Sequence, residues 1–446
     1  MKDLNWELVF KLKEFKAYYN SWDLNELSMT CKKFRNLLNS AVFKNFNFIA
    51  YVEANGYKSF KTEVVEEEEE INEANTPRNN NPDFAMCILP RNRDYKADVS
   101  NRINPYLPLT DEYIECKNQF KSDLKNLHIQ PKQVGLYYSK DYYYLLRDIP
   151  DAFSKLSTLT ITYSHLTVES LQHMLDNLNY LENFELTRYN FASFVKDKLN
   201  PIRLYTGEIT NAGSTYLRLT PKHLPKLTNL ECKVFGQDHE IEYLDNFLKL
   251  NTQIKNLKIG GGNLSKKTFD IFKSYENLTH LELSYLGYEL SESDFNDFPI
   301  LNRVSHLSIL LRSDAESLHQ LILKFPNLTS CLIEAIFGDF DQFYDICINL
   351  PKIKNLYLKK HSSWGHPIEI TLPKIDNLTG IEFSLHSFSE YEKFKMNADS
   401  CKNLKSIKFI EDGEQISSDD SKLSPQLTGS WKVVHFHRSF SYYRNY

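Results

Sequence analysis

The 446-residue sequence contains no long uninterrupted hydrophobic run. A membrane-spanning helix needs about 20 consecutive apolar residues, and no stretch of this chain approaches that length. The N-terminus begins Met1-Lys2-Asp3-Leu4, which puts charges where a secretory signal would begin its apolar segment. These two absences predict a soluble chain that has no membrane partner.

Cysteines are few and scattered, and net positive charge is absent. The seven cysteines are an odd number and form no Cys-x-x-Cys pair, which favours reduced thiols in the cytoplasm or nucleus. Lys plus Arg number 53 against 58 Asp plus Glu, so the net charge of −5 argues against nucleic acid as a partner. With 14 glycines, 16 prolines and 41% hydrophobic residues, collagen-like and wholly disordered classes are excluded.

The usual sequence signatures of catalysis are also missing. There is no phosphate-binding loop, no Gly-x-Ser-x-Gly elbow and no His-Glu-x-x-His pair. No group of His and Cys has the spacing of a zinc site. We therefore expect no catalytic residue, no cofactor and no metal, and interpret the chain as something other than an enzyme.

A repeated pattern occupies most of the chain from residue 156 onward. Its unit is apolar-x-x-apolar-x-apolar, as in Leu227/Leu230/Cys232. Such triples arise by chance roughly thirty times in a chain of this composition, so their even spacing is the evidence. Their first positions advance by about 25 residues, if residues 204–209 are counted as a weak copy.

This period and pattern resemble the leucine-rich repeat, in which each unit supplies one short parallel strand. Inside the triple, apolar and polar residues alternate as in a strand with one buried face. Between triples the spacing is helical, as in Leu171/Met174/Leu175/Leu178. The prediction is an α/β leucine-rich-repeat solenoid of strand–helix units of about 25 residues.

Composition and pattern divide the chain into four predicted segments. Residues 1–42 form a helical module, and 43–155 hold irregular early repeats around an acidic insertion at 61–83 that is predicted to be disordered. Residues 156–430 are the repeats, and 431–446 form a C-terminal cap that begins with a last strand. The early repeats are expected at the triples Phe43/Phe46/Phe48 and Leu124/Leu127/Ile129.

The N-terminal module carries a second resemblance. Leu4-Asn5-Trp6-Glu7-Leu8, followed by Asp23-Leu24-Asn25-Glu26-Leu27-Ser28-Met29-Thr30-Cys31-Lys32-Lys33-Phe34-Arg35, is similar to the F-box. The resemblance implies docking on a Skp-type adaptor, and through it on a cullin–RING ubiquitin ligase, while the repeats hold a protein substrate. The matching adaptor-binding positions are Leu4, Leu8, Leu12, Leu24, Leu27, Cys31 and Phe34.

Two other functions stay open beside ligase attachment. If the N-terminal helices only cap the solenoid, the chain is a non-catalytic interaction scaffold. Leucine-rich proteins also serve as enzyme inhibitors or GTPase regulators, although no polar catalytic residue stands out in a repeat loop of this sequence.

Strand alternation also predicts the residues that meet a partner. The second, fourth and sixth offsets of each triple should face the concave side, since the third and fifth point inward. Consecutive glutamates in this row suggest a dock for a basic segment of the substrate, unless neighbouring lysines neutralise them. An apolar anchor is expected further along, and the predicted partner-binding residues are Glu185, Glu208, Glu231, Lys258, Glu282, Leu332 and Tyr357.

Overall fold

The protein is described here by a computed structural model that forms two compact units, residues 1–226 (unit 1) and 227–446 (unit 2). The N-terminal module and the acidic insertion lie outside the described residues. Within the part of the chain that the structure describes, no helix is long and apolar enough to cross a membrane. The structure describes residues 44–59, 111–127, 130–187, 190–192, 219–233, 238–260, 264, 266–286, 295–311, 320–335, 350–360, 368–385, 394–411, 426–436 and 439–444.

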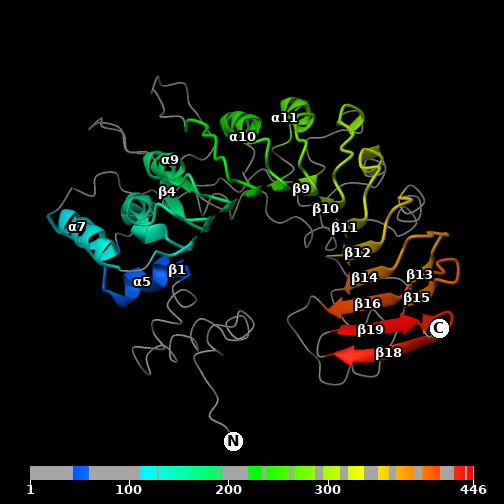
Figure 1. Cartoon of the computed structure of the whole chain (residues 1–446). Helices are drawn as coiled ribbons and strands as arrows, with labels where there is room; N and C mark the ends of the chain where they lie inside the picture. Colours follow the sequence, from blue (N-terminus) through cyan, green and yellow to red (C-terminus); the bar gives the residue numbers. More distant parts are fainter. Residues whose placement is uncertain are drawn as a thin grey trace, which may run out of the picture. The chain divides into compact units, whose positions relative to one another are not determined.

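Unit 1 contains short parallel strands alternating with helices (Figure 1). Its main sheet has the order β1-β2-β3-β5, and every neighbouring pair is parallel. A second parallel pair joins β4 to β6. The elements are β1 (Asn45–Asn47), α5 (Phe48–Ala54), α7 (Asp111–Asn126), β2 (Gln133–Tyr137), the 3-10 helix η3 (Lys140–Asp148), α8 (Ile149–Ala152), β3 (Thr158–Thr162), β4 (His165–Thr167), α9 (Val168–Asn177), β5 (Asn183–Thr187) and β6 (Asn190–Ala192).

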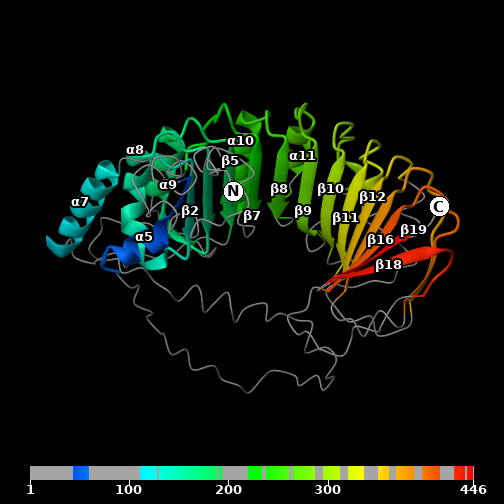
Figure 2. The same ribbon diagram turned by 60° about the horizontal axis from the view of Figure 1, so that its bottom comes forward.

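In unit 2 each sequence repeat contributes one strand to a longer main sheet. Its order is β7-β8-β9-β10-β11-β12-β14-β16-β19-β18 (Figure 2). A smaller sheet has the order β13-β15-β17. The elements are β7 (Asn229–Lys233), α10 (Asp238–Leu250), β8 (Asn256–Gly260), α11 (Lys266–Phe272), β9 (His280–Leu286), β10 (His306–Leu311), β11 (Ser330–Ala335), β12 (Asn355–Lys360), β13 (Ile368–Thr371), β14 (Gly380–Leu385), β15 (Phe394–Asn397), β16 (Ser406–Glu411), β17 (Gln426–Leu427), β18 (Trp431–Phe436) and β19 (Ser439–Arg444).

The strands β7 to β12, β14 and β16 of unit 2 coincide with the predicted triples, whereas no triple marked β13, β15 and β17 of the smaller sheet. On β8, Leu257 and Ile259 are buried while Lys258 between them is exposed, and the same alternation holds on the parallel strands up to β16. The inward residues share one core with α10 and α11, which lie on one side of the sheet (Figure 1). Unit 2 is therefore an α/β solenoid of the leucine-rich-repeat kind.

The recurrent Asn-Leu-Thr before the strands has a structural reason. Asn377 Nδ2 donates to the Pro351 carbonyl at 2.7 Å, and Thr379 Oγ1 donates to the Lys354 carbonyl at 3.0 Å. Both bonds reach back one repeat, and Asn327 with Thr329 makes the equivalent pair. The polar residues of this lead-in thus tie neighbouring repeats together while the leucine between them enters the core.

A stack of phenylalanines fills unit 2 on the side away from the strands. Phe272, Phe298 and Phe325 are almost fully buried, one from each of three successive repeats. The Phe298 ring centroid lies 5.8 Å from that of Phe272 and 5.8 Å from that of Phe325. These contacts join repeats that could not bury an apolar core alone.

The C-terminal end differs from the prediction of a single last strand. Residues 431–436 do form a strand, β18, but it does not pair with the preceding repeat. Instead β19 pairs antiparallel with β16, and β18 pairs antiparallel with β19. Phe440 and Tyr442 of β19 are buried and close the end of the core.

One of the two early triples was assigned to the wrong element. Leu124 lies in the helix α7 and Leu127 directly follows it, so neither belongs to a strand, while Ile129 lies outside the described residues. The strand of that repeat is β2, in which Val134 and Leu136 point inward after the buried Pro131. The other triple contributes Phe46 to β1, which pairs with β2.

Candidate functional site

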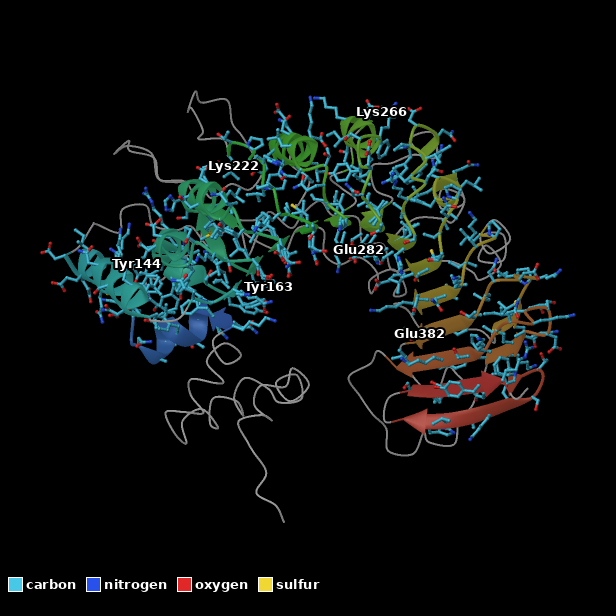
Figure 3. The ribbon with its side chains drawn as sticks, in the orientation of Figure 1. Tyr144, Tyr163, Lys222, Lys266, Glu282 and Glu382 are labelled. Atoms are coloured by element: carbon cyan, nitrogen blue, oxygen red, sulfur yellow. The ribbon has the colours of Figure 1, made fainter. Side chains whose placement is uncertain are left out.

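The sheet of unit 2 has one face covered by helices and an opposite face that we call its open face. Figure 3 shows Lys266 of α11 and Glu282 of β9 on opposite sides of this sheet. Strand pairing brings the fourth-offset residues into one row across the open face. In order from β7 to β16, this row consists of Glu231, Lys258, Glu282, Ser308, Leu332, Tyr357, Glu382 and Lys408.

The first three residues of the row form a charge cluster. Lys258 Nζ lies 3.4 Å from Glu231 Oε2 and 3.3 Å from Glu282 Oε2, so one ammonium bridges two carboxylates. Burial lowers the pKa of Lys258, but Glu282 and Glu231 outweigh burial and hold that pKa above its usual value. The cluster is electrostatically satisfied within the chain.

Two more ion pairs lie toward the other end of the open face. Lys359 Nζ is 3.4 Å from Glu334 Oε1, and Lys408 Nζ is 3.2 Å from Glu382 Oε2. Each pair joins neighbouring strands directly opposite one another. The open face therefore carries charges of both signs that are already matched across the strands.

Leu332 and Tyr357 lie in the row between the charge cluster and the pair of Glu382 and Lys408, and the pair of Glu334 and Lys359 lies two residues further along the same two strands. Leu332 and Tyr357 are directly opposite one another on β11 and β12, and both are partly exposed. Ser308 on β10 is their neighbour toward the charge cluster. The structure thus brings five predicted partner-binding residues of unit 2 into one row, with an apolar pair next to paired charges.

Two histidines on the open face were missed from the sequence. His280 and His306 are opposite one another on β9 and β10, with ring centroids 4.0 Å apart and nearly parallel planes. Each ring Nδ1 is within hydrogen-bonding distance of the preceding hydroxyl, of Thr279 or Ser305. Burial, and then the neighbouring His306, lowers the pKa of His280. Their equivalent position at the second offset of two successive triples was the available signal.

The predicted row of three glutamates is not assembled among the described residues. Glu208 lies outside them, while Glu185 belongs to unit 1 and Glu231 to unit 2. For Glu231 the alternative holds, because Lys258 supplies its counter-charge. All seven predicted adaptor-binding residues also lie outside the described residues, so their role stays a prediction.

Glu185 has a different environment from the glutamates of unit 2. It lies opposite Thr160, which lies opposite Gly135, in a row across β5, β3 and β2. Thr160 Oγ1 and Thr162 Oγ1 donate to the two carboxylate oxygens, each at 3.4 Å. Within the described part of the chain no lysine, arginine or histidine pairs with this carboxylate.

A stacked tyrosine pair directly after β2 and β3 is a second feature that sequence reasoning missed. Tyr138 and Tyr163 stack with ring centroids 4.9 Å apart at an interplanar angle of 6°. Both follow a strand directly and precede a serine, so the Tyr-Ser pair recurring one repeat apart was the available signal.

No group of three or more potential metal ligands occurs among the described residues.

Comparisons with known proteins find similarity only among solved structures. No protein-family model matches the chain, and no curated protein matches it. It is similar to the leucine-rich repeat-containing protein LegL7 from Legionella pneumophila, at 13% identity and a TM-score of 0.36 over 68% of this chain and 92% of that one. It is also similar to a chain of the mouse RP105/MD-1 complex, at 13% identity and a TM-score of 0.27 over 67% of each chain. Likenesses at these values carry no information on function.

Proposed function

We propose that the chain is a non-catalytic protein-interaction module that binds a partner protein through the open face of unit 2. The observation that carries this proposal is the apolar pair Leu332 and Tyr357 among cross-strand ion pairs. Protein interfaces have this anatomy, with an apolar or aromatic centre and a polar rim.

The paired charges explain why such a face suits binding. A lone charge costs free energy when a partner removes its water, whereas a charge that keeps its counter-ion costs much less. Glu282 keeps Lys258, and Glu334 keeps Lys359, when a partner covers the centre. Binding energy would then come chiefly from burying Leu332 and Tyr357 against an apolar side chain of the partner.

A photo-crosslinking experiment tests this proposal. Benzoylphenylalanine placed at Tyr357 in the full chain should crosslink to a discrete partner, identified by mass spectrometry. The matched control places the same group at Ile300, which is 63% exposed in the connection before β10. Partners captured equally from both positions, or from Ile300 alone, would show that the open face is not the binding surface.

Attachment to a ubiquitin ligase is a second candidate, favoured by the resemblance of residues 4–35 to the F-box. In this function the open face would hold the substrate, and the N-terminal module would hold a Skp-type adaptor that leads to a cullin–RING ligase. Full-length chain carrying Leu24→Asp and Leu27→Asp should lose a purified Skp-type adaptor in a pull-down and still crosslink through Tyr357. Retention of the adaptor by this variant would reject ligase attachment through the module and leave the interaction proposal in place.

A further inference from the structure

Glu185 is a half-buried glutamate on β5 whose carboxylate has no lysine, arginine or histidine partner among the described residues. Glu231, Glu282, Glu334 and Glu382 each have a lysine within 3.4 Å. Glu185 has only the hydroxyls of Thr160 and Thr162, at distances long for an O–H···O bond. Two weak neutral donors leave most of the capacity of a carboxylate unused.

An aromatic ring lies in the same row as this carboxylate. A Cβ added at Gly135 would overlap the Tyr137 ring at Cε2, so the ring covers Gly135. Thr160, between Gly135 and Glu185, is only 8% exposed, although Tyr137 itself is 46% exposed. The Tyr137 ring and the Glu185 carboxylate therefore flank a buried threonine. The backbones of Gly135, under the ring, and of Glu185 are two strand spacings apart, or about 9.6 Å.

Two further tyrosines extend the aromatic surface at the end of the same strands. Tyr138 and Tyr163 have φ of 56° and 51°, the only positive values at non-glycine residues in the described part of the chain. Their N–H groups still donate to Thr162 and Thr187 carbonyls, so the unusual conformation continues the strand ladder. The Ser164 hydroxyl supports this turn by donating to the Leu136 carbonyl at 2.7 Å. The outcome is a stacked pair in which Tyr138 is 65% exposed.

We propose that this surface of unit 1 binds an arginine side chain of a partner protein. The proposal deepens the protein-interaction function above and rests on it. The guanidinium would lie on the exposed Tyr137 ring and donate two N–H groups to the Glu185 carboxylate, which has no cationic partner among the described residues. Tyr138 and Tyr163 would contact the neighbouring residues of the partner.

Arginine suits the site better than lysine for two reasons of geometry. Its planar guanidinium stacks on a tyrosine ring and presents parallel donors to a carboxylate at the same time. The guanidinium is also wide enough to reach from the Tyr137 ring toward the Glu185 carboxylate, which is hydrogen-bonded to Thr160 between them. The ammonium of lysine is a compact point charge.

Short peptides test the site without knowledge of the natural partner. The probes are acetyl-Gly-Arg-Gly-amide and its lysine and citrulline counterparts, titrated against the full chain by saturation-transfer NMR. Citrulline keeps the shape of arginine and removes its charge. Since the acidic segment Glu66–Glu70 attracts any cation, each peptide is compared between wild type and variants.

Three variants separate the site from general electrostatics. Glu185→Gln should weaken the arginine peptide about tenfold, as expected for loss of a charge-assisted pair. Gly135→Ala should weaken it severalfold, because the new methyl displaces the Tyr137 ring without altering any charge. Glu369→Gln, which makes the same charge change on β13 at a glutamate paired with Lys395, should leave binding unchanged.

The proposal is supported if the arginine peptide binds more tightly than the other two and both unit 1 variants weaken it. Absence of binding, equal binding of arginine and citrulline peptides, or wild-type affinity in Glu185→Gln would each overturn it. Equal binding of lysine would overturn the assignment to arginine. Thermal unfolding of each variant checks that the fold is retained. Crosslinking at Tyr357 does not depend on these residues, so it reports separately on the proposed function.

Discussion

Replacing Lys258 by methionine removes the one cation shared by Glu231 and Glu282 and keeps most of the apolar stem. Each of the two contacts, at 3.4 Å and 3.3 Å, is a partly exposed ion pair, because the lysine side chain is 47% exposed. Exposed pairs contribute about 0.2–1 kcal/mol each after solvent screening. Without the lysine, repulsion between the two glutamates, which lie two strands apart, adds about 0.4 kcal/mol in water. The free energy of unfolding should therefore fall by about 1 kcal/mol, or about 2–4 °C in Tm for a unit of this size.

Urea unfolding followed by circular dichroism at low and high salt measures this effect. The matched control is Lys267→Met on α11, an exposed lysine with no carboxylate partner among the described residues. At 1 M NaCl, where the Debye length is about 3 Å, the difference between the two variants should shrink by more than half. In a background of Glu231→Gln and Glu282→Gln, removal of Lys258 should cost nothing measurable. Equal stability of the two single variants at low salt would refute this account of the charge cluster.

Three further predictions concern titration, buried polar contacts and thiol reactivity. The lowered pKa of His280 beside His306 means that its contribution to stability is complete above about pH 6.5, the unfolded value, and is lost as the pH falls toward the folded value. Urea unfolding of His280→Asn should accordingly depend less on pH between 7.5 and 5 than wild type does, and identical slopes would contradict this. The buried Thr268 hydroxyl donates to Asp245 Oδ1 at 2.6 Å, so Thr268→Val should lower the free energy of unfolding by about 1–3 kcal/mol; a loss below about 0.5 kcal/mol in the same assay would count against that bond. Complete burial raises the pKa of Cys331 to about 12, so iodoacetamide at pH 8 should leave this thiol unmodified in the native protein and alkylate it in urea, and peptide mass spectrometry showing equal labelling would oppose the structure.

The strands β7 to β12, β14 and β16 of unit 2 were predictable because each one places two apolar residues inward at a fixed spacing. That pattern is local, so it is visible in sequence wherever the repeat is regular. Leu124 and Leu127 show its limit, since a spacing of three residues fits one turn of helix as well as the start of a triple. In that repeat the first apolar position is taken by Pro131, two residues before β2, which hid the true repeat. The antiparallel pairing of β19 was not visible because it depends on a chain reversal within the last residues.

The candidate site was predictable only as a row of positions. Alternation identified Leu332 and Tyr357 as residues of the open face, and the strand register makes them neighbours. Which glutamate receives a lysine depends on side-chain conformations across two strands, which no local pattern encodes. For the same reason the threonine-only contacts of Glu185 in the described part of the chain, and the ring of Tyr137 over Gly135, emerge only from the structure.

The most direct test of the central claim compares two substitutions of the same chemistry in unit 2. Leu332→Asp puts a charge at the centre of the open face, and Ile300→Asp puts the same charge at an exposed apolar residue away from it. The partner is first identified by crosslinking at Tyr357. Isothermal titration of that purified partner, without a crosslink, then gives the affinity of each full-length variant. The account predicts that Leu332→Asp weakens binding at least a hundredfold, since hot-spot residues contribute about 3 kcal/mol or more, while Ile300→Asp binds as wild type does. Equal affinities for the two variants, with both folded by thermal unfolding, would contradict binding through the open face.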